Sequence, residues 1–183
     1  MDTTPRMLTK YRTEVLPQLM ADFKYKTVMA APKITKITLN VGFGRMVKDA
    51  KFIEKLEADL TQLGGQKPAM RKAKKSIAGF KLREGSEIGM IVTLRGKRMY
   101  DFIDRLVSVA LPRTRDFHGL NAKSFDRQGN LSIGIKEHNI FPEIHYETLK
   151  DIFGLQVTVT TSAKNKEEGL RLLKLIGFPI KEK

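Results

Sequence analysis

Residues 88–110 read Ile-Gly-Met-Ile-Val-Thr-Leu-Arg-Gly-Lys-Arg-Met-Tyr-Asp-Phe-Ile-Asp-Arg-Leu-Val-Ser-Val-Ala. From Ile88 to Leu94 every second residue is apolar, which is the period of a half-buried strand. From Met99 to Ala110 apolar residues recur at helical spacing, and we expect this helix to end before Pro112. A strand that leads directly into an amphipathic helix favours a fold in which helices pack on one face of a sheet.

The rest of the chain extends this pattern in both directions. Pro17 interrupts the first helix and must kink it or start a second one. Asp49 is placed to cap the second helix and Gly64-Gly65 to end it, while Asn165 and Glu168 resemble a capping box. The fold class predicted is α+β, in two layers, with a mixed or antiparallel sheet in a single domain of residues 1–183. Helices are predicted over 8–23, 52–63, 99–110 and 166–176, and strands over 36–41, 88–95, 131–135 and 155–160.

The chain is strongly basic and has no cysteine. Its 34 Lys and Arg residues exceed its 20 Asp and Glu residues by 14, an excess typical of proteins that bind nucleic acid or an anionic membrane surface. Without cysteine there are no disulfides, thiolate zinc sites or cysteine nucleophiles. No apolar run approaches the roughly 20 residues of a membrane span, and the first residues do not resemble a signal peptide. We therefore expect a cytoplasmic globular protein with no membrane partner.

Half of the net charge lies in one short segment. Residues 67–83 carry seven basic side chains and no acid. A charge run is usually a solvated face, but here no acid is interspersed, and glycines at 64, 65, 79 and 85 indicate an exposed loop. The run favours contact with nucleic-acid phosphates, which position a ligand more than they specify its sequence.

The face of the sheet opposite the helices is expected to be polar. If the apolar residues of the two central strands point to the core, then Lys36, Thr38, Asn40, Thr93 and Arg95 point away from it. Asn and Thr side chains are suitable partners for RNA phosphates and 2′-hydroxyls, although an ordinary solvated sheet face is an equally good interpretation. Two aromatic residues, Phe43 and Phe80, lie among glycine or basic residues, where they could stack on a base. A place in the core is the better expectation for each of these two.

No motif for catalysis or for a cofactor emerges. Gly42-Phe43-Gly44 follows a strand, but Val47 stands where a dinucleotide fold needs its third glycine, so a turn that requires glycine conformations is the better explanation. There is no P-loop. His138 and His145 lack the spacing of a metal-binding pair, and Pro142 prevents one helix from presenting both imidazoles. We therefore predict no enzymatic activity, no metal and no cofactor.

Two other classes of function are open on charge alone. A general RNA chaperone or membrane-surface protein would bind many polyanions alike, and would show an apolar and basic helix face that we do not find. An enzyme acting on nucleic acid would need carboxylates or a metal site inside the basic surface, and residues 67–83 contain no carboxylate.

Residues 72–85 read Lys-Ala-Lys-Lys-Ser-Ile-Ala-Gly-Phe-Lys-Leu-Arg-Glu-Gly, and they are one of a series of short motifs spread over nearly the whole chain. The others are Gly65–Pro68, Tyr25–Met29 before Pro32, Asn40–Gly44, Val92–Gly96, Met99–Phe102, Gly129–Asn130, Phe141–Ile144, Leu172–Leu173 and Gly177–Pro179. Present together and in this order, they closely resemble the bacterial ribosomal protein L-five (L5) family, large-subunit proteins that bind 5S ribosomal RNA.

The resemblance implies a structural constituent of the large ribosomal subunit, with no catalysis, that anchors 5S rRNA in the central protuberance. The partners implied are 5S rRNA, 23S rRNA, P-site tRNA, other 5S-associated large-subunit proteins, and a protein of the small-subunit head across an intersubunit bridge. Positions that match the rRNA-binding surface, together with the outward-facing residues above, are Lys36, Thr38, Asn40, Gln66, Lys67, Thr93 and Arg95. Those of the tRNA-contacting loop are Arg71, Lys72, Lys74, Lys75, Ser76, Phe80, Lys81 and Arg83. The bridge is assigned to Arg113, Arg115 and His118, and more loosely to residues 142–146.

Three positions depart from the family pattern. Arg71 stands where Thr is common and adds charge to the loop. Ile91 stands where a basic residue is usual, which either removes a phosphate contact or indicates a packed position. His138 stands where Gln is frequent, and its role is left open.

Overall fold

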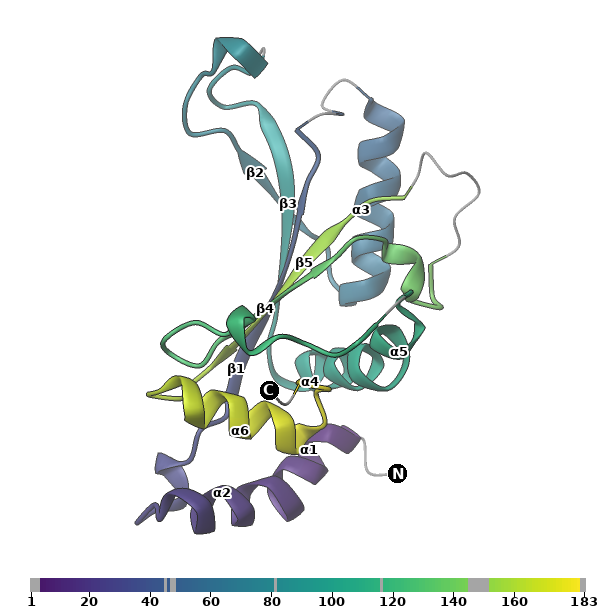
Figure 1. Cartoon of the computed structure of the whole chain (residues 1–183). Helices are drawn as coiled ribbons and strands as arrows, with labels where there is room; N and C mark the ends of the chain where they lie inside the picture. The colour runs from purple at the N-terminus through teal and green to yellow at the C-terminus, as the bar shows by residue number, and fades with distance from the viewer. Residues whose placement is uncertain are drawn as a thin grey trace.

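The computed structural model describes residues 4–44, 46, 49–80, 82–115, 117–144 and 152–181. Its centre is a five-stranded sheet in the order β2-β3-β1-β5-β4, and every neighbouring pair is antiparallel. This confirms the α+β class and selects the antiparallel form of the sheet (Figure 1). The strands are β1 (Ile34–Gly42), β2 (Ala69–Lys72), β3 (Glu87–Leu94), β4 (Leu131–Ile135) and β5 (Leu155–Thr161).

The buried apolar residues of the four longer strands face one side of the sheet. Ile37, Leu39 and Val41 of β1 are buried, and cross-strand pairing aligns them with Leu94, Val92 and Met90 of β3. The same pairing continues through Leu155, Val157 and Val159 of β5 to Leu131, Ile133 and Ile135 of β4. A continuous apolar face of this kind holds the helices by burial of nonpolar surface, and it confirms the predicted two-sided pattern.

The helices lie where periodicity predicts them, with additional short turns. The α-helices are α1 (Arg6–Lys10), α2 (Leu16–Phe23), α3 (Ala50–Gly64), α4 (Gly96–Arg105), α5 (Leu111–Arg113) and α6 (Lys166–Ile176). The π-helical segments are Tyr11–Val15 and Leu106–Ala110, and short 3₁₀ turns occur at Val28–Ala30, Ala78–Phe80, Ala122–Ser124 and His138–Ile140.

Both helices that contain proline pass through it, and this corrects the predicted helix end before Pro112. Each proline is the second residue of an α-helix, α2 or α5, that directly follows a π-helical segment. Proline has no N–H to donate and clashes with the carbonyl four residues before it in a regular helix. The wider π turn changes that spacing, so each helix continues instead of ending. Pro17 therefore lies in the first turn of a second α-helix, α2, as one of its two predicted effects requires. The helical path that begins with α4 continues through Pro112 to Arg113.

The predicted caps hold at α3, but the predicted capping box of α6 does not form. The Asp49 carboxylate accepts a hydrogen bond from the Phe52 N–H at 3.2 Å, and Gly65 ends α3 with φ of 65°. At α6, Asn165 makes no side-chain cap bond, while Glu168 accepts from the backbone N–H of Lys164 at 2.9 Å. Glu168 thus caps the residue before Asn165, and neither hydrogen bond of the predicted capping box forms. The Gly42–Gly44 turn is also corrected, because neither of these glycines has a positive φ.

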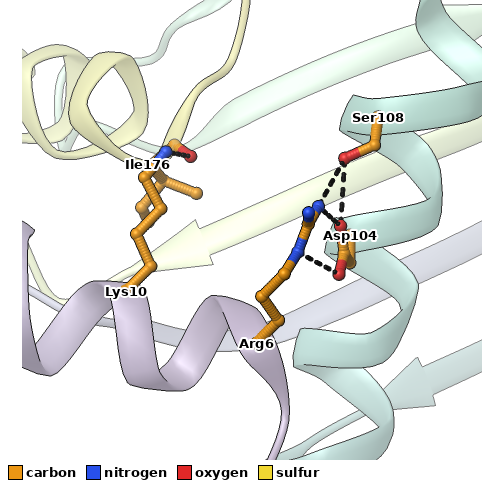
Figure 2. A network of polar contacts seen from close by, with 5 residues as sticks. All are labelled: Arg6, Lys10, Asp104, Ser108 and Ile176. Atoms are coloured by element: carbon orange, nitrogen blue, oxygen red, sulfur yellow. Dashed lines mark hydrogen bonds and ion pairs between the residues drawn. The ribbon is translucent and has the colours of Figure 1, made fainter.

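The N-terminal helix is joined to both neighbouring helices by polar contacts. Arg6 Nε donates to the Asp104 carboxylate at 3.0 Å, and its guanidinium also reaches Ser108 Oγ at 3.0 Å (Figure 2). Lys10 Nζ donates to the carbonyl of Ile176 at 2.9 Å, where α6 ends (Figure 2). A cation on the last carbonyls of a helix satisfies groups that have no partner within the helix. These contacts join α1 to α4 and to α6.

Candidate nucleic-acid interface

The outward face of the sheet carries a row of hydroxyl side chains. Strand register aligns Ser132 of β4 with Thr158 of β5, Thr158 with Thr38 of β1, and Thr38 with Thr93 of β3. Ser132 and Thr93 are exposed, while Thr38 and Thr158 are half-buried. Neighbouring strands lie about 4.8 Å apart, so the row presents a hydroxyl at each step across the sheet.

A second row runs beside the first. It aligns Gly134, Gln156, Asn40 and Ile91 across β4, β5, β1 and β3. Asn40 and Gln156 are exposed, and Gly134 presents no side chain. Lys36 pairs with Thr160 on the far side of the hydroxyl row. We call the two rows together with Lys36 and Thr160 the polar face.

The polar face brings together Lys36, Thr38, Asn40 and Thr93, as sequence alternation predicts. Four of its polar side chains, Ser132, Gln156, Thr158 and Thr160, were missed as site residues. Alternation alone does place Thr158 outward, but only the pairing of β5 with β1 makes it a neighbour of Thr38. Arg95 lies just beyond β3, exposed at the N-cap of α4.

Gln66 and Lys67 are engaged at the edge of the polar face. The Gln66 amide donates to the Thr93 carbonyl at 3.0 Å and accepts from Arg98 at 3.2 Å. Lys67 forms an ion pair with Glu57 at 2.8 Å, and the hydrogen bond and charge of Glu57 raise the pKa of Lys67. Both residues therefore fix the start of β2 against α3 and β3.

The basic segment, predicted as an exposed loop, is a hairpin arm. Strands β2 and β3 pair antiparallel, and beyond them Ala73 N–H donates to the Ser86 carbonyl at 2.8 Å. Ile77 and Leu82 exchange two further backbone hydrogen bonds, at 2.9 and 3.1 Å. A 3₁₀ turn, Ala78–Phe80, closes the arm, which projects beyond the rest of the sheet at the top of Figure 1.

The arm displays charge along its length and apolar side chains at its tip. Phe80 is 80% exposed and Ile77 is 46% exposed, so the expectation that Phe80 is a core residue is wrong, whereas Phe43, 3% exposed, is confirmed as core. Ser76 accepts the backbone N–H of Glu84 at 2.9 Å and so stabilises the arm itself. Lys81 lies outside the described residues. The exposed basic residues of the arm are Arg71, Lys72, Lys74, Lys75 and Arg83.

The three residues assigned to a bridge lie elsewhere, after the helix that follows β3. Arg113 is the last residue of α5, and Arg115 and His118 are exposed in the irregular segment beyond it. Arg115 and His118 line a surface hollow of about 520 Å³, together with residues of β4 such as Ile133. Tyr146 and His145, part of the looser bridge assignment, lie outside the described residues.

Among the residues that the structure describes, no group of three or more His, Asp or Glu side chains is placed to hold a metal ion. Within the same part of the chain, no helix is both long and apolar enough to cross a membrane.

Comparisons with known proteins match both halves of the chain. Residues 27–83 match the family described as Ribosomal protein L5, and residues 87–180 match the family described as ribosomal L5P family C-terminus. A Large ribosomal subunit protein uL5 of Cupriavidus metallidurans is 53% identical over 178 residues, 97% of this chain and 99% of that protein. Proteins of the same name from Geotalea daltonii and Streptococcus thermophilus are 51% and 53% identical, covering 96% and 95% of this chain and 98% and 97% of their own lengths. The chain belongs to the ribosomal protein L5 family.

As a member of the L5 family, the protein is a structural constituent of the large ribosomal subunit and therefore belongs to the ribosome of the bacterial cytoplasm. Its relatives are ribosomal proteins and not enzymes, which supports the prediction of a non-catalytic role.

The three departures from the L5 family pattern have different surroundings. Arg71 is exposed on the arm, where its charge adds to the basic run. Ile91 is half-buried between Asn40 and Ala69 of the adjoining strands, which favours the packed interpretation of this position. His138 is fully buried, its ring stacks on Phe153 at 3.9 Å, and its Nδ1 accepts the Phe153 N–H at 3.2 Å. The role of His138 is therefore to pack the segment before β5 against the core.

Proposed function

We propose that this L5-family protein binds 5S rRNA with its polar face and anchors it in the central protuberance of the large subunit. The observation that carries the proposal is the pair of polar rows, which crosses the sheet from β4 to β3 on the face opposite the apolar core. Double-stranded RNA presents 2′-hydroxyls and base edges in a wide, shallow minor groove. A flat row of small hydroxyl and amide side chains fits such a groove, because none of them is long enough to hold the RNA away.

Charge around the polar face would supply most of the affinity. Lys36 and Arg95 lie at its borders, and each phosphate they neutralise would release counterions. Gln66 and Lys67 would act mainly by holding the edge of the face, since their polar atoms already bond to Thr93, Arg98 and Glu57. Contacts with 23S rRNA and with other 5S-associated proteins would involve other surfaces of the molecule.

We propose further that the hairpin arm contacts P-site tRNA. Its exposed cations suit the phosphates of a second RNA, and the exposed Phe80 at its tip suits stacking on a base. The bridge to the small-subunit head is assigned to Arg113, Arg115 and His118 on the exposed segment after α5.

We also propose that residues 1–183 form a single RNA-binding domain with the arm at 67–85. The two segments matched by the family models share one sheet, because β1 of the first lies between β3 and β5 of the second. Neither segment could complete this core alone.

A gel-shift titration with 5S rRNA over a series of salt concentrations, with excess bulk tRNA as competitor, tests the proposal. A discrete complex that resists the competitor near physiological salt is expected, and Asn40→Ala or Thr93→Ala should weaken it by about 1–3 kcal/mol if a buried hydrogen bond is lost. Loss of the complex to equal amounts of tRNA would leave only a general basic surface. Unchanged affinity in both variants would refute the role of the polar face.

A further inference from the structure

The corner between α2 and β1, residues 24–30, exposes apolar side chains that packing does not explain. Met29 is 88% exposed and Val28 is 55% exposed, and Met29 is the most exposed of the large apolar residues that the structure describes. In Figure 1 this corner lies at the bottom of the molecule, at the end opposite the arm. Single exposed apolar residues are common on protein surfaces, so the case depends on how this one is held and on what surrounds it.

The corner is fixed in shape. Lys24 adopts a left-handed conformation with φ of 51°, the only positive φ of a non-glycine residue among those described. A 3₁₀ turn follows, in which Ala30 and Ala31 donate to the carbonyls of Thr27 and Val28 at 3.1 and 3.2 Å. A left-handed lysine costs conformational energy that the surrounding structure must offset. Met29 is therefore presented on a defined turn.

Tyr11 attaches the end of the corner to the N-terminal helical stretch, and the buried hydroxyl of Tyr25 lies beside α6. Tyr11 Oη donates to the carbonyl of Pro32 at 3.0 Å. Burial of its hydroxyl and the neighbouring Glu168 carboxylate of α6 raise the pKa of Tyr25 to about 12. These surroundings leave the Met29 side chain uncovered.

Three lysines lie within five residues of the exposed methionine in the chain. Lys24, Lys26 and Lys33 are exposed, and none of them forms an ion pair with a described residue. The nearby acid Asp22 is already paired with Arg171 at 2.6 Å. The corner is thus an apolar tip within a group of lysines.

The corner also adjoins the polar face. The pairing of β1 with β5 continues to Lys33, whose N–H donates to Ser162 Oγ at 3.0 Å and whose carbonyl accepts the Ser162 N–H at 2.9 Å. Lys36, a border residue of the polar face, follows three positions later on the same strand. An RNA lying along the polar face would therefore meet the corner as it leaves the sheet.

We infer that residues 24–30, together with Lys33, form a second RNA-binding site, in which Met29 and Val28 pack against an unstacked base or a ribose while Lys24, Lys26 and Lys33 bind phosphates. The inference rests on the proposed binding of RNA to the polar face and extends it. Methionine suits this task, because its flexible and polarizable thioether adapts to flat aromatic surfaces. Bases that are splayed out of a helix are the usual target of such contacts in RNA.

Titration of a 5S rRNA transcript against the full chain at several salt concentrations tests the inference. Met29→Ser should weaken binding about tenfold at every salt concentration, since it removes a nonpolar contact and no charge. Lys26→Ala should weaken binding and lower the slope of log affinity against log salt by about 0.7–0.9. Met46→Ser, at the other described methionine with an exposed side chain (43%), is the matched control and should bind like the wild type.

The outcomes separate this inference from the proposed function. If the wild type forms no specific complex, both fail. If the wild type binds and Asn40→Ala weakens it while Met29→Ser and Lys26→Ala behave like the wild type, the second site is refuted and the polar face stands. If these two variants keep full RNA affinity but no longer enter large subunits, the corner contacts a protein, and the inference is equally refuted. Thermal unfolding should be unchanged in both variants, because each side chain is exposed.

Discussion

Thr158 lies in the middle of the hydroxyl row, between Thr38 on β1 and Ser132 on β4. Thr158→Val keeps the shape and β-branching of the side chain and removes only its hydroxyl. Among the described residues that hydroxyl is bonded only to Ser132, at 3.4 Å, and it is half-buried, so stability should change by less than about 0.5 kcal/mol. Binding of 5S rRNA should weaken by about 1 kcal/mol, measured by filter binding with thermal unfolding in parallel.

The matched control for this change is Thr13→Val. Thr13 lies on the N-terminal helical stretch, and its hydroxyl donates to the Thr9 carbonyl at 3.0 Å. Thr13→Val makes the same chemical change at a position away from the polar face, so the affinity for 5S rRNA should stay at the wild-type value. If Thr158→Val binds 5S rRNA as tightly as Thr13→Val does, the Thr158 hydroxyl makes no contact with the RNA.

Asp126 makes the turn before β4 sensitive to pH. Its carboxylate accepts the N–H groups of Gln128 and Asn130 at 2.9 and 2.8 Å, and the Asn130 side-chain amide at 2.7 Å. Partial burial alone would raise the pKa of Asp126, but these hydrogen bonds outweigh it and lower the pKa below its ordinary value. The folded state therefore favours the charged carboxylate more than the unfolded state does.

The stability from this turn should be present above the unfolded pKa, about 4, and lost as pH falls through the lower folded value. Asp126→Asn should cost about 0.5–1 kcal/mol in the free energy of unfolding at pH 7, and the difference from the wild type should shrink as pH falls below about 4. Urea unfolding at pH 7, 5 and 3 measures it. A difference that stays constant over this range would show that the charge of Asp126 plays no part.

At the residue scale, period-2 alternation predicts which way a strand side chain points. Hydrophobicity predicts less reliably whether a side chain is buried. Asn40 and Thr93 point outward as expected, because each lies on a strand whose neighbours in sequence are strongly apolar. Phe80 could not be placed, since its hydrophobicity favours the core while its position at the tip of a charged hairpin leaves it 80% exposed. The stacking of His138 on Phe153 joins two segments whose contact no local pattern encodes.

Helix α6 depends on a close approach of two glycine backbones. A Cβ built at Gly169 would lie only 2.3 Å from the Gly129 carbonyl oxygen and 2.5 Å from its Cα. In an open helix, replacing Gly by Ala stabilises by roughly 0.5–1 kcal/mol. Here the clash with rigid backbone should reverse the sign, and Gly169→Ala should destabilise the protein by about 1–3 kcal/mol in urea unfolding.

Gly134→Ala is the control for this effect. A Cβ at Gly134 meets no atom within 4 Å, so the free energy of unfolding should stay within about 0.5 kcal/mol of the wild type. If Gly169→Ala is as stable as the wild type, α6 can shift away from the Gly129 turn, and the close approach is not needed for the fold.

At the element scale, the sequence predicts which elements exist and fails at some of their ends. The long helices and the four longer strands follow from their periodicity. The helix through Pro112 continues because a π turn precedes it, and the spacing of apolar residues does not record the difference between an α and a π turn. Strand β2 is short and largely exposed, so it has no alternation to detect. For this reason the sequence predicts only an exposed loop where the structure has a hairpin arm.

At the scale of the whole molecule, the order of strands could not be predicted. Strand β1 pairs with β3 and with β5, which lies near the end of the chain, and these pairings place Thr38 between Thr93 and Thr158. Local patterns report which face of a strand is buried but not which strand lies beside it. For this reason the sequence predicts the half of the polar face that lies on β1 and β3 as a site. The half on β4 and β5 is assigned to the site only once the strand order is known.

The same architecture separates the arm from the polar face, so substitutions in one surface should not affect RNA binding by the other. Lys74→Ala combined with Lys75→Ala removes two exposed cations from the arm, beyond the end of the paired strands. If about five to seven phosphates are neutralised by the polar face and its borders, log 5S affinity should fall with log salt at a slope near −4 to −6, and the arm variant should keep that slope. The arm variant should instead weaken the binding of P-site tRNA to reconstituted ribosomes. Asn40→Ala should leave that tRNA binding unchanged once 5S rRNA is incorporated.

Changes at distant sites without shared partners are additive, so a variant that combines Asn40→Ala with the two arm substitutions should show both defects at their single-variant sizes. A smaller 5S slope in the arm variant would mean that RNA on the sheet also runs along the arm, and the two surfaces would then be one continuous binding site.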